Sequence, residues 1–258
     1  MRRYTGKKWD TRRWAALDNL RGLTLLSMIA YHACWDMVYI FGADWGWYRS
    51  TLAYLWQQSI CWTFILLSGF CWSLGSHPLR RGLEVFGGGL LVTAVTLLIM
   101  PENRVVFGVL TLLGSCMLLM IPLERLLRRV PAWAGLAGSA VLFWLLRHVN
   151  QGFLGRVGPA TYLASLPAGL YRNLATAFLG FPPAGFFSTD YFSLLPWLFL
   201  FLAGYFINRL WRERGRIPSG GLRIPLLGAL GQYSLPVYLI HQPVIYGLLW
   251  CLTALRGA

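Results

Sequence analysis

The sequence predicts an all-α fold, a polytopic bundle of about seven transmembrane helices, from two features of composition and one of charge. Of the 258 residues, 57% are hydrophobic and only 12% are charged, whereas soluble domains carry about 25% charged residues. The apolar residues gather in runs of about 20, the length that a helix needs to cross the hydrocarbon core. The basic residues gather mainly in the short connections between these runs.

The spans follow from these apolar runs. They are predicted at about residues 20–41, 52–74, 82–100, 105–123, 131–147, 191–208 and 226–254. We expect the last span to be interrupted at Pro236 and Pro243, because proline removes a backbone donor from a helix. Within the Gly- and Pro-rich connection 148–189, the segment 160–180 is predicted as an interfacial or re-entrant helix. A further spanning helix at 160–180 remains the alternative.

The charge pattern indicates the orientation of the bundle. The chain has 23 Lys and Arg against 9 Asp and Glu, a formal charge of +14. With the N-terminus inside, the basic arm 1–19 and most arginines between the spans fall on the cytoplasmic side, as the positive-inside rule requires. We therefore expect an N-in, C-out domain over 20–258. Membrane lipids are its expected partners, and nucleic-acid binding is excluded because the basic residues form no long stripe.

Ionisable side chains inside the spans are candidates for function, because each costs roughly 2.5–3.5 kcal/mol to insert into lipid. His32 and Asp36 lie four residues apart in the first span, so both are expected on one helix face. A carboxylate beside an imidazole is the arrangement of a general base and the acid that orients it. The alternative is a structural hydrogen-bonded pair. Arg21 lies about three helical turns before His32 and can pair with Asp18.

Three further polar positions carry two interpretations each. His241 and Gln242 lie beside Pro243, where freed carbonyls need polar partners, so they indicate either a helix kink or a ligand site. Gln57 either faces the level of His32 or joins two helices. Asp190 either caps the sixth span or presents a carboxylate to a substrate at the outer mouth.

Small residues and thiols have simpler interpretations. Gly87, Gly88 and Gly89 in the third span predict a close helix contact, with a ligand-approach surface as the alternative. The five cysteines all lie in apolar runs and form no CxxC, so we expect buried free thiols, no disulfide and no metal site. No nucleotide-binding loop, HExxH or nucleophile elbow is found.

Four ordered motifs resemble those of one family of membrane proteins. They are Leu17-Asp18-Asn19-Leu20-Arg21-Gly22 through Met28 to His32, Phe107-Gly108-Val109-Leu110, Ser188-Thr189-Asp190-Tyr191-Phe192 with Leu195-Pro196-Trp197, and Ser234-Leu235 with Tyr238-Leu239-Ile240-His241-Gln242-Pro243. Together they cover nearly the whole chain. The sequence resembles bacterial membrane proteins related to the catalytic domain of heparan-α-glucosaminide N-acetyltransferase. It is similar, more distantly, to the membrane acyltransferase-3 group, whose first helix has the spacing of Arg21 and His32.

This resemblance implies an acyltransferase of the bacterial inner membrane. The acyl group, expected to be acetyl from cytoplasmic acetyl-CoA, would pass to an amine or hydroxyl of a sugar or envelope glycan. His32 would be the base or the acyl-accepting histidine, with Arg21 in the same motif and Asp36 beside it. Arg12, Arg13, Arg80 and Arg81 would hold the phosphates of the donor, and Asp190, His241, Gln242 and Gln57 would contact the acceptor.

The sequence departs from the family at one position of interest. Family members often have a histidine after the second motif, where this chain has Thr111. No histidine lies between His32 and His77 either, although the lysosomal enzyme's active histidine has been placed beyond the first motif. A transporter or flippase of a small molecule or lipid-linked intermediate is the alternative function, because intramembrane histidines and a Pro-broken last helix suit it equally.

Overall fold

The computed structural model describes residues 14–215, 222 and 224–256, and the membrane-length segments among them are helical. The helices are α1 (Ala15–Tyr39), α2 (Thr51–Cys71), α3 (Pro78–Ile99), α4 (Val109–Leu127), α5 (Ala132–Leu146), α6 (Leu174–Leu179), α7 (Leu194–Glu213), α8 (Pro225–Gln232) and α9 (Ser234–Arg256). One small antiparallel hairpin, β1 (Phe153–Arg156) and β2 (Tyr162–Ser165), lies between α5 and α6. The prediction of an all-α membrane bundle is therefore confirmed.

Within these described ranges, 5 segments are long and apolar enough to cross a membrane. Three of them are the helices α3, α4 and α7. The other two are the stretch Ala132–Gln151, which contains α5, and Ser234–Leu255, which lies in α9. The helices α1 and α2 have 25 and 21 residues, enough to span at 1.5 Å per residue, but they carry more polar side chains. The count of seven spans and the N-in orientation remain predictions.

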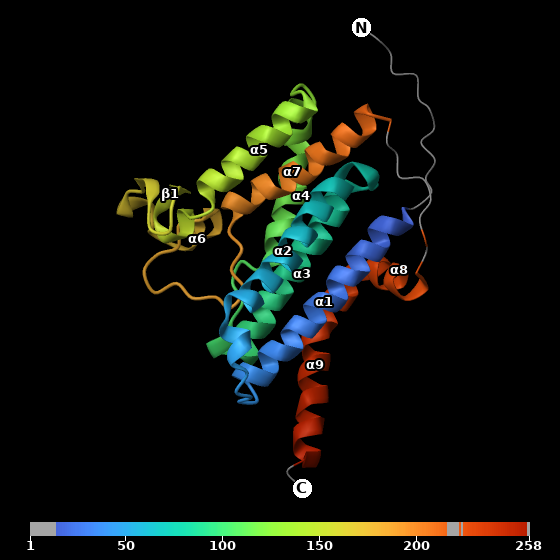
Figure 1. Cartoon of the computed structure of the whole chain (residues 1–258), viewed down its shortest axis with the longest axis vertical. Helices are drawn as coiled ribbons and strands as arrows, with labels where there is room; N and C mark the ends of the chain where they lie inside the picture. The colour runs from blue at the N-terminus through green and yellow to red at the C-terminus, as the bar shows by residue number, and fades with distance from the viewer. Residues whose placement is uncertain (1–13, 216–221, 223, 257–258) are drawn as a thin grey trace.

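The long helices are arranged around α4 and α7 (Figure 1). The pairs in closest association are α3 with α4, α5 with α7, and α2 with α7. Helix α1 packs on α2, α8 and α9, so the first and last long helices of the chain are neighbours. Figure 1 shows α9 continuing past α1 to the end of the molecule where the C-terminus lies.

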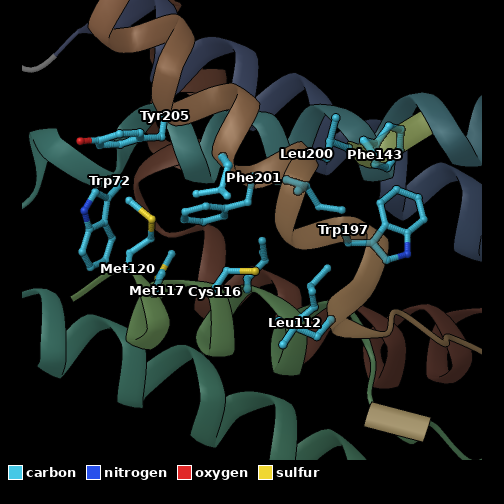
Figure 2. Packing of buried hydrophobic residues seen from close by; sticks show 14 of the residues in the cluster. Trp72, Leu112, Cys116, Met117, Met120, Phe143, Trp197, Leu200, Phe201 and Tyr205 are labelled. Atoms are coloured by element: carbon cyan, nitrogen blue, oxygen red, sulfur yellow. The ribbon is translucent and has the colours of Figure 1, made fainter. Parts of the chain in front are cut away.

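The main hydrophobic core lies where α4 meets α7. Met117 and Cys116 of α4 face Phe201 of α7, as Figure 2 shows. In the most apolar 18-residue stretch of each span, 56% of the residues are buried in α4 and 61% in α7. In α3 and in α9 only 11% are buried. Helices α3 and α9 therefore form the outer wall, and side chains such as Leu98, 84% exposed, are placed to meet lipid.

The connection before α7 differs from the prediction. Residues 160–180 form the strand β2, a turn at Ala168–Leu170 and the 6-residue helix α6. The expected interfacial or re-entrant helix is absent from this segment, and a span there is wrong as well, because six helical residues rise only about 9 Å. Gly and Pro at short intervals favour turns over a long helix.

The predicted last span, 226–254, is two helices. The break falls at Tyr233, between α8 and α9, and α9 continues through Pro243. Pro236 lies in the first turn of α9, where its missing N–H costs no helical hydrogen bond. The interruptions predicted at Pro236 and Pro243 are therefore wrong in position: the helix ends before the first proline and tolerates the second.

The short helix α8 is held tightly against α1. A Cβ atom on Gly22 of α1 would lie 2.1 Å from the carbonyl oxygen of Leu227, and one on Gly231 of α8 would lie 2.0 Å from that of Asp18. Only glycine permits this approach of the two backbones. The contact fixes α8 beside Arg21, whose Nη1 donates to the carbonyl of Gly231 at 3.5 Å.

Candidate active site

Helices α1 and α9 bring together two polar pairs from residues more than 200 positions apart. The rings of His32 and His241 have centroids 4.9 Å apart with an interplanar angle of 63°. One turn further along α1, Asp36 Oδ1 accepts a hydrogen bond of 2.6 Å from Gln242 Nε2. His32 and Asp36 share a face because of their i, i+4 spacing, and the α9 pair supplies one partner for each.

This pairing corrects the expected contact between His32 and Asp36. No hydrogen bond or ion pair joins the two side chains, although both lie within the described helix α1. The carboxylate of Asp36 is directed to Gln242 instead, and the ring of His32 lies between Tyr31 at 6.1 Å and His241. Asp36 therefore does not orient His32 by direct contact.

Three polar atoms at this junction are buried and have no hydrogen-bond partner among the described residues. They are Asp36 Oδ2, Gln242 Oε1 and His241 Nε2. An unsatisfied buried polar group costs about 1–3 kcal/mol, more when it is charged. Groups of this kind are uncommon in folded proteins, and a cluster of three in one place is an expected feature of a functional site.

A cavity of about 310 Å³ lies next to this junction, at the lower end of the range of ligand pockets. Arg21 and Arg81 line one part of it, and Tyr238 and Val109 line another. The ring of Tyr238 has its centroid 5.3 Å from that of His241. Neither histidine itself lines the cavity, so the cavity ends one aromatic ring away from the histidine pair.

The arginines at the cavity have unequal numbers of partners. Arg21 lies 3.7 Å from Asp18 and donates to the Sγ atom of Cys71 at 3.3 Å. Arg81 passes over Gly75, where a Cβ atom would lie 1.6 Å from Arg81 Nη1. That Nη1 atom is buried and has no hydrogen-bond partner in the part of the chain that the structure describes. Arg81 therefore keeps an unused guanidinium donor beside the cavity that it helps to line.

Asp190 does not cap the sixth span, which was one of its two interpretations. Helix α7 begins at Leu194, and the side chains of Ser188 and Asp190 instead accept hydrogen bonds from the backbone at the start of α4. Ser188 Oγ accepts from the N–H of Val106 at 2.9 Å, and Asp190 Oδ2 accepts from the N–H of Val109 at 3.2 Å. Burial raises the pKa of Asp190 to about 6, and the bond from Val109 opposes this rise. Its exposure to a substrate remains a prediction.

The other predicted site residues lie away from the histidine pair or outside the described residues. Arg80 is exposed and pairs with Glu84 at 2.7 Å. Gln57 is partly buried on α2, and a role in binding remains a prediction. Arg12 and Arg13 lie outside the described residues.

Two polar residues of the bundle were not candidates from the sequence. Tyr238 was quoted only within a motif, although a tyrosine three residues before His241 must lie on the same helix face and its ring contacts His241. Arg147 follows the last residue of α5, and its guanidinium lies 4.6 Å over the ring of Trp197. It also donates to Gln58 Oε1 at 2.7 Å, which joins α5 to α2.

The threonine that stands where relatives often have histidine packs between two helices. Thr111 is 3% exposed and lies at a close contact of α4 with α3. A Cβ atom on Gly89 would lie 2.5 Å from the backbone nitrogen and from Oγ1 of Thr111. The prediction of close packing at the triple glycine is therefore confirmed at Gly89.

Helices of spanning length, buried polar pairs between them and a cavity lined in part by arginines define the class of this protein as a polytopic helical membrane protein. The chain belongs to the family described as "Heparan-alpha-glucosaminide N-acetyltransferase, catalytic", whose sequence profile matches residues 13–243. The family resemblance of the four motifs is thus confirmed, and it is a family of membrane acetyltransferases. A search of curated proteins and a search of solved structures found no match.

Proposed function

We propose that this protein is a membrane-embedded acyltransferase that moves an acetyl group from acetyl-CoA to an amine or hydroxyl of a sugar or envelope glycan. The observation that carries the proposal is the cavity of about 310 Å³, which has arginines at one part and Tyr238, the neighbour of His241, at another. Membership of the N-acetyltransferase family supports the same reaction class. The protein would lie in the inner membrane with its N-terminus in the cytoplasm, where the donor is made.

The donor would bind by its phosphates at the arginine end. Coenzyme A is polyanionic, and guanidinium groups bind phosphate through paired, charge-assisted hydrogen bonds. Arg81 Nη1 has no hydrogen-bond partner among the described residues, and Arg21 keeps N–H donors beyond its contacts with Asp18, Cys71 and Gly231. Arg12, Arg13 and Arg80 would add positive charge around the entrance.

The geometry of α1 then directs the acyl end toward the histidines. Arg21 and His32 lie on one helix, eleven residues apart, which corresponds to about 16 Å along its axis. A donor held by its phosphates at Arg21 and Arg81 would extend its flexible arm along the cavity and place the thioester near Tyr238 and the histidine pair. A small movement of the Tyr238 side chain would open the last part of this path.

The reaction needs a base at this point. The acceptor nitrogen or oxygen attacks the thioester carbon, a new bond to the acyl carbon forms, and the bond from carbon to sulfur breaks. The proton of the acceptor goes to His32, which returns it to the leaving thiolate, so that the products are the acetylated acceptor and free coenzyme A. Histidine suits this exchange because its unperturbed pKa is near 6.5. In the alternative mechanism the His32 ring attacks the thioester first and forms an acyl-histidine intermediate.

Asp190, Gln57 and Gln242 would line the acceptor's route from the outer side.

The experiment uses the full chain in lipid nanodiscs with acetyl-CoA carrying a labelled acetyl group. Amino sugars and their N-blocked analogues serve as acceptors, and the labelled product is separated by chromatography. His32→Ala is expected to abolish transfer. Arg81→Gln is expected to raise the KM for acetyl-CoA by about 10- to 100-fold, because a hydrogen bond to a charged group contributes about 1.5–3 kcal/mol.

Arg128→Gln is the matched control, since Arg128 is exposed and pairs with Glu124 on the surface of α4. Its KM is expected to stay within about twofold of the parent value. Equal KM values for the Arg81 and Arg128 variants would remove the cavity from donor binding. Movement of a glycan across liposomes without any acyl donor, with no labelled product, would support a transporter instead.

A further inference from the structure

The tautomer of His241 follows from its one hydrogen bond. The Nδ1 atom of His241 lies within hydrogen-bond distance of the carbonyl oxygen of Tyr238, one turn earlier in α9. A carbonyl oxygen can only accept, so Nδ1 must carry the hydrogen and donate it. In the neutral ring Nε2 then has no hydrogen and presents a lone pair.

This lone pair faces the interior without a partner. His241 is 7% exposed, and its buried Nε2 atom has no hydrogen-bond partner within residues 14–215, 222 and 224–256. The ring that faces it is His32 of α1, with centroids 4.9 Å apart. Two imidazoles joined by an N–H···N bond of about 2.9–3.0 Å have centroids roughly 5 Å apart. The terminal torsion of histidine is broad, so a modest rotation of either ring makes this bond.

We propose that His241 is a positioning residue that accepts a hydrogen bond at Nε2 from His32 and thereby fixes the tautomer of His32. The ring nitrogen of His32 that faces His241 then carries the hydrogen, and its other nitrogen carries the lone pair. That second nitrogen is the atom that takes the proton of the acceptor. This inference rests on the proposed function for its catalytic consequence, but the tautomers themselves do not depend on any reaction.

The pairing also explains why the carboxylate of Asp36 is not used for this purpose. Asp36 accepts from Gln242 at 2.6 Å, one turn away from the histidines, and makes no bond to His32. In either neutral tautomer one ring nitrogen of His32 carries a hydrogen, and fixing the tautomer requires an acceptor for that hydrogen. His241 supplies it without placing a negative charge beside the base.

The test has a spectroscopic part that requires no activity. The chain has four histidines, so selective ¹⁵N labelling of histidine gives few signals, which can be assigned by His→Gln variants. Two-bond ¹H–¹⁵N spectra in nanodiscs report which nitrogen of each ring is protonated. We expect a single Nδ1–H tautomer for His241 and a single tautomer for His32, with ordinary mixtures at the exposed His77.

The variants separate positioning from packing. His241→Phe keeps a ring but removes the acceptor, so His32 is expected to change to a mixture of tautomers. His241→Gln keeps an acceptor oxygen and is expected to preserve the His32 tautomer. In the transfer assay, His241→Phe is expected to lower kcat by about 100-fold or more with the KM for acetyl-CoA unchanged, and His241→Gln is expected to recover much of the loss.

The outcomes distinguish this inference from the proposed function. A protonated Nε2 in His241, or an unchanged His32 spectrum in His241→Phe, would overturn the positioning role even if the enzyme transfers acetyl groups. A parent protein with the expected tautomers but no transfer to any acceptor would overturn the proposed function and leave the pairing in place. Equal kcat for the Phe and Gln variants would also count against positioning.

Discussion

The bond between Asp36 and Gln242 allows a quantitative prediction for stability. Asp36 is 0% exposed, and Gln242 Nε2 is the one partner of its carboxylate among the described residues. Gln242→Leu removes that donor and leaves both oxygens of Asp36 buried and unpaired. A hydrogen bond to a charged group contributes about 1.5–3 kcal/mol, so we expect Gln242→Leu to lower the free energy of unfolding by about 2–3 kcal/mol.

The double variant Asp36→Leu/Gln242→Leu is expected to be more stable than Gln242→Leu alone. Replacing both members of a buried polar pair by apolar side chains removes the unpaired atoms as well as the bond, and such exchanges are often close to neutral. Here the double variant also removes the unpartnered atoms Asp36 Oδ2 and Gln242 Oε1. We therefore expect it to recover at least about half of the loss caused by Gln242→Leu.

The assay is reversible unfolding in mixed micelles with a denaturing detergent, followed by circular dichroism, for the parent, both single variants and the double variant. The double-mutant cycle gives the interaction energy between the two side chains. An interaction energy of zero would refute the assignment of this bond, and a double variant less stable than either single variant would refute the argument about unpaired atoms.

Two further predictions concern helix packing and pH. Gly89→Val is expected to lower the thermal midpoint of unfolding, because its Cβ would lie 2.5 Å from the Thr111 backbone and such overpacking costs about 1–3 kcal/mol. Gly87 has open space around it, so the control Gly87→Ala is expected to change the midpoint little. Equal midpoints for the two variants would contradict the close α3–α4 contact. Burial raises the pKa of Asp190 to about 6 from 3.8, so the unfolded chain loses this proton first and stability is expected to fall as pH rises from about 4 to 6 and then to level off. Asp190→Asn should abolish that fall in unfolding measurements across this range, and an identical pH profile in the variant would refute it.

The helices were predictable because lipid imposes a simple rule on the sequence. Apolar runs of about 20 residues located every long helix to within a few residues at most ends. The errors came from proline and glycine. Pro236 indicated a break that the structure places at Tyr233, since a proline is accommodated in the first turn of a helix, and 160–180 was too rich in turn residues for the helix expected there.

The candidate site was predictable as a set of residues but not as an arrangement. The cost of inserting His32, Asp36 and His241 into lipid identified all three from the sequence. Spacing along one helix suggested that Asp36 serves His32, whereas the partner of each side chain comes from α9. The register of α9 against α1 depends on packing between segments separated by most of the chain. Here Gly231 of α8, the short helix that leads into α9, lies against Asp18 of α1, and no local pattern encodes this contact.

The low burial of α9 has a consequence for work with the purified protein. This helix supplies His241 and Gln242, yet only 11% of its most apolar window is buried within the chain, so phospholipid acyl chains complete its solvation and hold it in place. The α4–α7 core is self-contained by comparison. Stripping of lipid by a harsh detergent is therefore expected to detach α9, with His241 and Gln242, while the remaining helices stay folded. Any transfer activity should then disappear well before the helical signal does.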